Sequence, residues 1–147
     1  VIHRDIKPDN IMIGRFGETF VVDWGLAVPF ERTAHARESG EATLLADHTE
    51  GTQGSGNGAG TPAYMSPEQA NGSEVRFGPA SDIFSLGATL YRLLCGRPPY
   101  DPFHADAREL ARRCDYPRLR DVRRDVPRAL EAVCQRAMRP NPNDRYD

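Results

Sequence analysis

Hydrophobic residues near the start of the chain form two short runs that favour β-strands. The runs cover 11–13 and 19–22, are rich in β-branched and aromatic residues, and flank a stretch from Gly14 to Gly17. Runs of this kind on either side of a glycine-bearing turn are typical of a β-hairpin. We therefore predict a small antiparallel hairpin in this part of the chain.

The longest apolar pattern predicts a buried helix over 81–95. Its apolar side chains would surround almost the whole helical circumference, which is typical of a helix covered on most sides. Ser81 is expected to cap the start of this helix. Gly96, followed by Pro98 and Pro99, is expected to end it.

Two further helices are predicted later in the chain. A short polar helix is expected over 106–113. In the last helix, Pro127 lies near the first turn and the apolar residues from Leu130 to Met138 follow i, i+3, i+4, i+7 and i+8 spacing, with Pro140 ending the pattern. The chain is therefore predicted to be mainly α with a small β-hairpin, an α+β fold.

Residues 31–60 form a different kind of segment. They include six glycines and six serines or threonines but no Phe, Trp or Tyr. Segments longer than about 12–15 residues without secondary structure are usually functional loops or disordered. We expect a long flexible insert here, with at most a short, weak helix over 43–46.

Composition and charge exclude several classes of protein. The net charge is −2 and acidic and basic residues are nearly balanced, so no nucleic-acid surface is indicated. Hydrophobic runs do not exceed three residues, whereas a membrane span needs about 18. Three cysteines without CxxC spacing indicate neither a disulfide framework nor a zinc site, which fits a reducing compartment. We expect a cytoplasmic location for these residues.

Several polar motifs follow one another in a fixed order. They are His3-Arg4-Asp5-Ile6-Lys7-Pro8-Asp9-Asn10, Asp23-Trp24-Gly25, the segment 60–68 with the sequence GTPAYMSPE, the segment 82–87 with the sequence DIFSLG, and Arg145. In this order they resemble the C-terminal lobe of a bacterial-type Ser/Thr protein kinase over essentially the whole chain. The resemblance implies a protein-kinase-like C-terminal lobe, with the N-terminal lobe absent, that transfers the γ-phosphate of ATP to Ser or Thr hydroxyls of proteins. Residues 1–147 would then form part of a kinase domain, and 23–68 its activation segment.

The resemblance also assigns roles to five polar residues. Asp5 would accept a hydrogen bond from the substrate hydroxyl and orient it, and Lys7 would contact the transferring phosphate. Asn10 and Asp23 would bind Mg²⁺, or Mn²⁺, and through it ATP, because such hard cations prefer oxygen ligands. Thr61 would form hydrogen bonds toward Asp5 and Lys7, which favours Ser or Thr over Tyr as the acceptor.

Lys7 is also unusual by composition. It is the only lysine of the chain, beside eighteen arginines. A compact ammonium group two residues after the candidate base suggests a site that requires a point charge rather than a planar guanidinium. The alternative is chance, since a single lysine has to lie somewhere.

Other residues of the motifs are expected to have structural or regulatory roles. By resemblance, His3 and Trp24 would stack inside the kinase domain, and Gly25 completes the motif that begins at Asp23. Arg4 is the residue type that pairs with a phosphorylated Ser or Thr in the activation segment, although an unregulated insert is the alternative. The candidate acceptors are Thr33, Ser39, Thr43, Thr49, Thr52 and Ser55.

Two long-range contacts follow from the same resemblance. Asp82 would accept hydrogen bonds from backbone N–H groups of the His-Arg-Asp turn, whereas the plain alternative is a carboxylate that favours a helix N-terminus. Glu68 and Arg145, 77 positions apart, would form a buried ion pair.

The motifs that bind the rest of the nucleotide in this family are not found in the sequence. A Gly-rich phosphate loop, a Val-Ala-Ile-Lys strand and a partner glutamate all precede the catalytic loop in kinases. We expect them on an N-terminal lobe of the same parent chain, because this sequence begins at Val1 rather than Met. The isolated 147 residues are therefore expected neither to bind ATP tightly nor to transfer phosphate, and any membrane anchor would lie outside them.

Two other functions are considered. A small-molecule phosphotransferase of the aminoglycoside-kinase type has a similar catalytic loop and hairpin, but it normally lacks the segment found at 60–68. A noncatalytic kinase-like scaffold would only dock partners. Such a scaffold need not retain its polar site residues, and this chain has Asp5, Lys7, Asn10 and Asp23.

Overall fold

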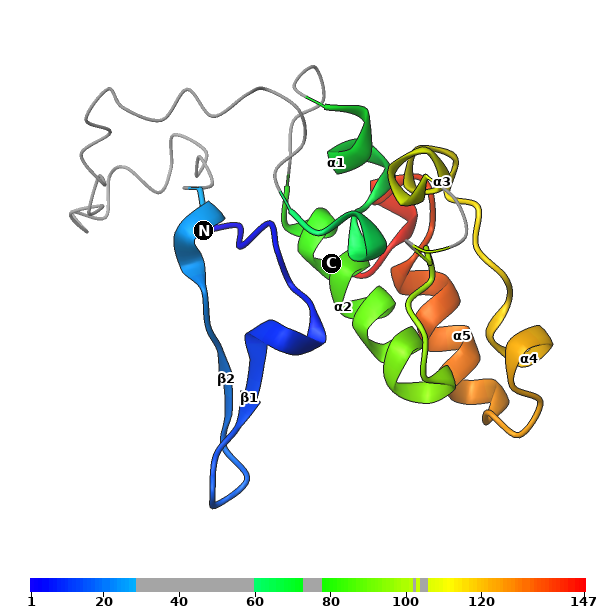
Figure 1. The fold of residues 1–147 in the computed structure, drawn as a ribbon, viewed down its shortest axis with the longest axis horizontal. Coiled ribbons are helices and arrows are strands. Elements are labelled where there is room, and N and C mark those ends of the chain that lie inside the picture. Colours follow the sequence, from blue (N-terminus) through cyan, green and yellow to red (C-terminus); the bar gives the residue numbers. More distant parts are fainter. Residues whose placement is uncertain (29–59, 73–77, 102, 104–105) are drawn as a thin grey trace.

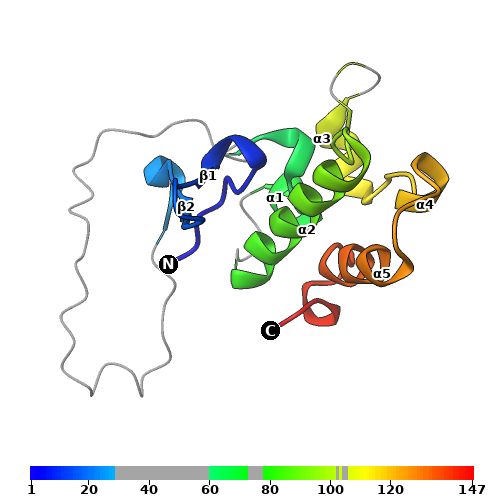
Figure 2. The same cartoon turned by 90° about the horizontal axis from the view of Figure 1, so that it is seen from below.

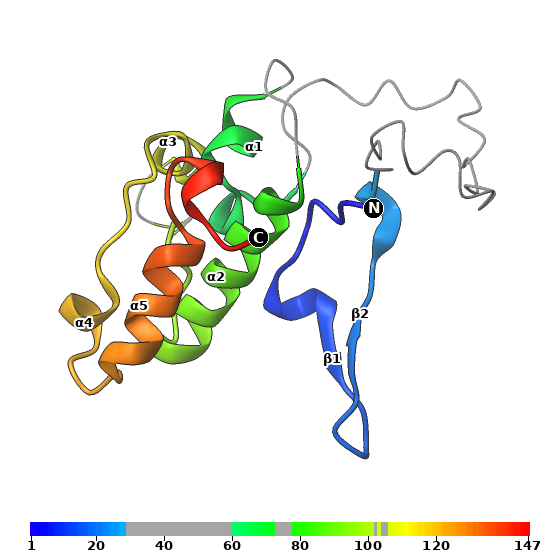
Figure 3. The ribbon, with the colours of Figure 1, turned by 180° about the vertical axis from the view of Figure 1, so that it is seen from behind.

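The computed structural model describes residues 1–28, 60–72, 78–101, 103 and 106–147. Over these residues a two-stranded antiparallel sheet precedes a group of helices, and the sheet stands apart from the helices in the views of Figures 1 and 3. The insert predicted over 31–60 lies outside the described residues except for Gly60, and the weak helix over 43–46 and the candidate phosphoacceptors lie wholly outside them.

The hairpin is confirmed near its predicted limits. A 3-10 turn, η1 (Pro8–Asn10), leads into β1 (Ile11–Ile13), which pairs with β2 (Thr19–Val21) in antiparallel register. The turn between them is tight, because Gly17 adopts a left-handed φ of 89°. A second 3-10 turn, η2 (Trp24–Leu26), follows β2.

A short helix that the sequence pattern did not predict follows at 67–71. The 3-10 turn η4 (Pro62–Tyr64) precedes α1 (Pro67–Asn71). The start of α1 is a capping box, in which Ser66 accepts from the Gln69 N–H and the Gln69 side chain accepts from the Ser66 N–H. Five residues are too few for a 3.6-residue apolar pattern to stand out, so only the cap marks this helix in the sequence.

The central helix α2 (Pro79–Cys95) starts two residues before its predicted beginning. Gly78 is its N-cap, so the prediction that Ser81 caps this helix is wrong. Ser81 lies inside the first turn, where its hydroxyl donates to Glu68 Oε1 at 2.8 Å. The predicted end is confirmed, because Gly96 adopts a left-handed φ of 84° and its N–H donates to Arg92 O.

The face of α2 that packs is narrower than predicted. Phe84, Ala88 and Tyr91 are buried in the core, but Leu86 and Leu93 are 43% and 69% exposed. Among the described residues, η4, α4 and α5 pack against α2. Within this part of the chain, α2 is therefore a core helix with one uncovered apolar face.

The remaining helices lie on the side of α2 away from the hairpin, as Figure 2 shows from below. They are α3 (Ala107–Arg113), α4 (Leu119–Val122), α5 (Arg128–Ala137) and the 3-10 turn η5 (Pro142–Asp144). The two predicted helices are α3, capped by Asp106, and α5, which begins after Pro127. None of the helices in the described ranges has the length and hydropathy of a membrane span.

Helices α2 and α5 approach each other closely at Gly87. A Cβ atom at this position would lie 2.7 Å from Ala137 Cβ and 2.8 Å from Met138 Cγ, both far too close. Because Gly87 has no side chain, the backbone of α2 can pack directly against the side chains of Ala137 and Met138. This close contact helps to hold α5 on the core.

Candidate active site

The turn formed by His3, Arg4 and Asp5 is fixed from α2. Asp82 Oδ2 accepts from His3 N–H at 2.7 Å, and Asp82 Oδ1 accepts from Arg4 N–H at 2.9 Å. The predicted contact between Asp82 and this turn is confirmed. Asp82 therefore does more than favour the helix N-terminus, because it connects α2 to the loop that carries Asp5.

The Asp5 carboxylate accepts hydrogen bonds from three other predicted site residues. Lys7 Nζ donates to Oδ2 at 2.8 Å, and Asn10 Nδ2 donates to the same oxygen at 3.3 Å. Thr61 donates to Oδ1 through its N–H at 2.8 Å and its hydroxyl at 2.9 Å. Lys7 Nζ also donates to Thr61 Oγ1 at 2.8 Å, which closes the cluster. Residues 54 positions apart are thereby brought to one point.

This environment keeps Asp5 ionised. Burial raises the pKa of the carboxyl group, but the hydrogen bonds from Lys7 and Thr61 outweigh it, so that the pKa of Asp5 lies below its ordinary value. Asp5 is therefore a carboxylate at neutral pH. It is a weak proton acceptor and a strong hydrogen-bond acceptor.

The hairpin brings the two candidate metal ligands to the same end of the sheet. Val22 N–H donates to Asn10 O at 2.9 Å, and Asp23 follows Val22 directly. Both side-chain hydrogen bonds of Asn10 use its Nδ2 group and end on Asp5, which leaves the amide oxygen for a ligand. Asp23 is exposed and has a left-handed φ of 63° at the start of η2. One amide oxygen and one open carboxylate fit a hard divalent cation.

His3 and Trp24 are in contact, as predicted, but in an edge arrangement. Their ring centroids lie 4.7 Å apart with an interplanar angle of 60°. His3 is buried, and its Nε2 bonds Val22 O while its Nδ1 accepts from Asp5 N–H. Trp24 is 54% exposed and its Nε1–H donates to Val21 O. His3 therefore ties the candidate base to the strand end, which suits a structural role.

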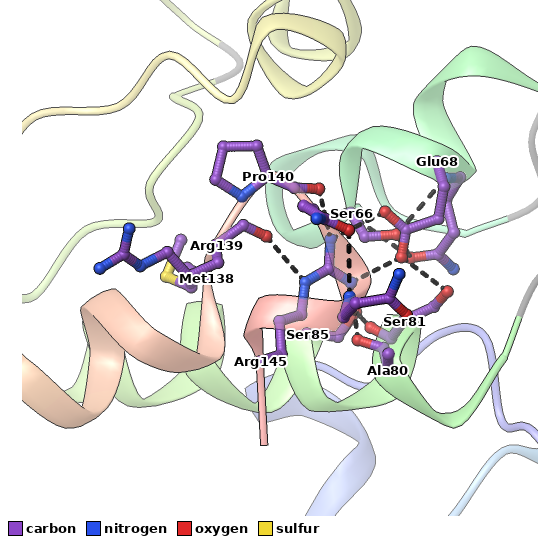
Figure 4. A network of polar contacts seen from close by, with 12 residues as sticks. Ser66, Glu68, Ala80, Ser81, Ser85, Met138, Arg139, Pro140 and Arg145 are labelled. Carbon is purple, nitrogen blue, oxygen red and sulfur yellow. Dashed lines mark hydrogen bonds and ion pairs between the residues drawn. The ribbon is translucent and has the colours of Figure 1, made fainter. Parts of the chain in front are cut away.

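The predicted ion pair between Glu68 and Arg145 is confirmed, and Figure 4 shows it within a polar network. The two guanidinium Nη atoms donate to the two carboxylate oxygens at 2.6 and 2.9 Å. The remaining N–H groups of Arg145 donate to the carbonyls of Ala80, Arg139 and Pro140. All five guanidinium N–H donors are therefore used.

The Glu68 carboxylate of this pair also accepts several hydrogen bonds. Burial raises the pKa of Glu68, but the hydrogen bonds and the positive charge of Arg145 outweigh it and hold the pKa below its ordinary value. The Ser81 hydroxyl adds a further hydrogen bond at 2.8 Å. The pair joins α1, the start of α2 and the last described turn.

Two predicted site residues are not explained by these contacts. The phosphorylated partner predicted for Arg4 would lie in 31–60, of which the structure describes only Gly60. Gly25 lies in η2, and a Cβ there would be in ordinary contact with Asp23 Oδ1 at 3.4 Å, so space alone does not require glycine.

Two cavities among the described residues lie away from this cluster. One of about 410 Å³ lies between Tyr91 and Met138, and one of about 270 Å³ lies between Arg97 and Leu110. Asp5 lines neither of them.

The sequence alone did not predict one polar contact with the turn that carries Asp5. Gln69 Nε2 donates to Arg4 O at 2.8 Å, across 65 positions of the chain. The capping box of Ser66 and Gln69 is visible in the sequence, but a carbonyl partner so far away is not.

Comparison with known proteins identifies the family of the chain. A model of the protein kinase domain matches residues 1–147. The chain is 32% identical to the Ser/Thr-protein kinase PknD of Chlamydia caviae, over 99% of this chain and 16% of that protein. It is 35% identical to PknD of Chlamydia trachomatis serovar L2b, with the same coverage. It is 36% identical to the Ser/Thr-protein kinase PknB of Mycolicibacterium smegmatis, over 99% of this chain and 21% of that protein.

The chain thus spans about a sixth to a fifth of the length of these relatives. The family match covers every motif identified above, from the His-Arg-Asp turn to Arg145. The chain belongs to the protein kinase domain family, and it is similar to bacterial Ser/Thr-protein kinases.

Proposed function

We propose that these residues form the C-terminal lobe of a Ser/Thr protein kinase that transfers the γ-phosphate of ATP to hydroxyl groups of proteins. The observation that carries the proposal is the cluster of Asp5, Lys7 and Thr61, in which a buried carboxylate and an ammonium lie 2.8 Å apart. Phosphoryl transfer requires an aligned nucleophile and neutralised charge more than covalent help, and this cluster supplies both.

Asp5 is suited to orient the acceptor hydroxyl. Its lowered pKa makes it a poor proton acceptor in the ground state, so it would hold the O–H in line and take the proton late in the transfer. Lys7 would stabilise the negative charge on the transferring group, because its ammonium already lies beside the acceptor site.

Asn10 and Asp23 would hold Mg²⁺, or Mn²⁺, in the proposed enzyme. When bound, such a cation would supply positive charge that offsets part of the negative charge of the phosphate groups. The role of the chain is to fix these ligands, since the Asn10 amide is oriented by two hydrogen bonds to Asp5. Asn10, one of the two proposed metal ligands, is therefore connected to the candidate base by hydrogen bonds.

The choice of a Ser or Thr acceptor rests on Thr61. Its hydroxyl lies between Lys7 Nζ and Asp5 Oδ1, at 2.8 and 2.9 Å. We propose that this bridge keeps the acceptor site close to the backbone of 60–68, which suits a short aliphatic hydroxyl. The names of the relatives agree, since they are Ser/Thr-protein kinases.

The proposal includes two further parts. Residues 23–68 would form the activation segment, with Arg4 pairing with a phosphorylated residue of 31–60. A separate N-terminal lobe of the same protein would supply the rest of the ATP site, so the 147 residues alone would be inactive. We further propose that the reaction takes place in the cytoplasm.

The test is phosphate transfer by the full-length protein that contains these residues. It should transfer the labelled γ-phosphate of ATP to Ser or Thr of a protein substrate, and the Asp5→Asn variant and the isolated chain should not. Transfer to aminoglycosides alone would support a small-molecule phosphotransferase. A wild-type protein that binds partners but transfers no phosphate would support a scaffold.

A further inference from the structure

The backbone at Arg4, next to the proposed base, has an uncommon conformation. Its φ of 73° lies in the left-handed region, which residues other than glycine rarely adopt. Such a conformation persists only where surrounding contacts hold it in place, and it often occurs at functional sites.

Side chains hold this backbone on both sides of the strained residue. On the N-terminal side, the N–H of Arg4 donates to Asp82 at 2.9 Å. On the C-terminal side, the peptide that joins Arg4 to Asp5 is bound at both ends: its oxygen accepts from Gln69 Nε2 at 2.8 Å, and its N–H donates to His3 Nδ1 at 3.3 Å. Gln69 is therefore the contact that fixes the carbonyl immediately before the base.

The chemistry of this contact requires an amide. Gln69 is 1% exposed, and its Oε1 accepts from Ser66 N–H at 3.1 Å and from Ser66 Oγ at 3.2 Å. Because Ser66 presents a donor and Arg4 presents a carbonyl, one end of the side chain must accept and the other must donate. A glutamine satisfies both, whereas a glutamate carboxylate would satisfy Ser66 and face the Arg4 oxygen with a second acceptor.

The space around the Arg4 carbonyl oxygen is also limited by Gly60. A Cβ at Gly60 would lie 2.9 Å from Arg4 O, so this oxygen is enclosed between Gly60 and Gln69. Gly60 itself has a φ of 122°, which suits glycine alone.

We propose that Gln69 is a positioning residue of the kinase reaction: it holds the strained Arg4 peptide and so sets the place of the Asp5 carboxylate. The proposal rests on the proposed function. Gln69 does not face the substrate itself, but it couples α1 to the catalytic turn through one buried amide. A small displacement of a reacting group lowers the rate of transfer more than it weakens the binding of substrates.

The test compares three variants of the full-length protein. Gln69→Glu keeps the acceptor for Ser66 but removes the donor to Arg4, and Gln69→Met removes both without burying a charge. Ser66→Ala is the matched control, because it weakens the cap of the same helix and leaves the Gln69 contact with Arg4 O intact.

We expect kcat to fall about tenfold in both Gln69 variants, with KM for ATP within about twofold of the wild type. Ser66→Ala should retain kcat within about twofold, although its thermal stability falls. Hydrogen exchange of the segment around Arg4 and Asp5 should be faster in Gln69→Met than in Ser66→Ala.

A Gln69→Met protein with wild-type kcat, or a Ser66→Ala protein that loses kcat as strongly, would overturn the proposal. If the Gln69→Glu protein does not fold, the kcat of Gln69→Met alone tests the proposal. A wild-type protein without kinase activity would instead contradict the proposed function. The exchange comparison then decides whether Gln69 holds the Arg4 peptide.

Discussion

At the scale of single residues, the Asp5 carboxylate is the centre of the site. Four hydrogen bonds end on its two oxygens, from Lys7, Asn10 and both donors of Thr61. A carboxylate with so many donors cannot rotate freely, so its orientation is set before any substrate arrives. Preorganisation of this kind lowers the cost of reorganisation during the reaction.

Replacing Lys7 by arginine tests whether the site requires a compact ammonium. The guanidinium is planar and larger, so it cannot bond Asp5 and Thr61 in the geometry of one Nζ atom with two 2.8 Å contacts. We expect Lys7→Arg to lower kcat of the full-length protein at least about tenfold. Arg15→Lys, at an exposed position of the hairpin turn, is the control and should leave kcat unchanged. Near-normal turnover of Lys7→Arg would reject the requirement.

Acid unfolding tests the environment of Asp5. Because its pKa in the folded state lies below that of the unfolded chain, the unfolded chain binds the proton first as the pH falls. The contribution to stability is therefore present above the ordinary pKa of Asp and is lost as the pH falls through the lowered value. We expect the stability difference between wild type and Asp5→Asn, from urea unfolding, to shrink as the pH falls from 7 toward about 3. A difference independent of pH would contradict this assignment.

The sequence predicted most of this site because the residues lie in short motifs. Asp5, Lys7 and Asn10 fall within one loop, and Thr61 falls within the next motif. The contact of Gln69 with Arg4 could not be predicted, since it depends on where α1 packs and not on any local pattern.

At the scale of elements, the cluster around Glu68 connects three segments. Arg145 reaches α1 through Glu68 and the first turn of α2 through the Ala80 carbonyl. Its guanidinium also lies 5.0 Å above the ring centre of Phe84. The position of α1, and with it Gln69, therefore depends on a residue at the far end of the chain.

Breaking this ion pair should destabilise the fold strongly. Both partners are buried, so removal of one leaves an uncompensated charge or several unpaired donors. We expect Arg145→Met to lower the free energy of unfolding by about 3–5 kcal/mol in urea. Asp125→Asn, which removes an exposed pair with Arg123, is the control and should have no measurable effect. Equal effects of the two variants would show that burial of the Glu68 pair is unimportant.

Helix limits were predictable where the local chain decides them. Gly96 ends α2 because its left-handed φ suits glycine, and this is visible in the sequence. The start of α2 was misplaced because Pro79 begins the helix after Gly78, while the Ser81 hydroxyl is used by Glu68. The Ser81 hydroxyl thus donates to Glu68, a distant residue, and does not cap the helix.

At the scale of the whole molecule, the described residues expose an apolar surface on the hairpin. Met12 and Phe20 are register partners and therefore lie on one face of the sheet, where they are 56% and 55% exposed. Trp24, in the next element, is exposed to a similar degree, whereas His3 beside it is buried.

The solubility of the isolated chain tests this surface. Exposed apolar patches promote association, so replacing Met12 and Phe20 by serine should raise the soluble fraction and reduce binding of a hydrophobic dye. Leu93→Ser, on the uncovered face of α2, is the comparison and should have a smaller effect because it is one residue rather than a pair. An unchanged soluble fraction of the double variant would contradict the importance of the hairpin face.

The Glu68 pair also has a consequence for synthesis on the ribosome. Synthesis proceeds from the N-terminal side, so α1 and α2 emerge well before Arg145 exists. Until then Glu68 has no guanidinium partner, and the bridge through Arg145 from α1 to the Ala80 carbonyl of α2 is missing. The helical part therefore completes its folding only after Arg145 leaves the tunnel, and nascent chains that stall before this point would expose α1 to proteases and chaperones.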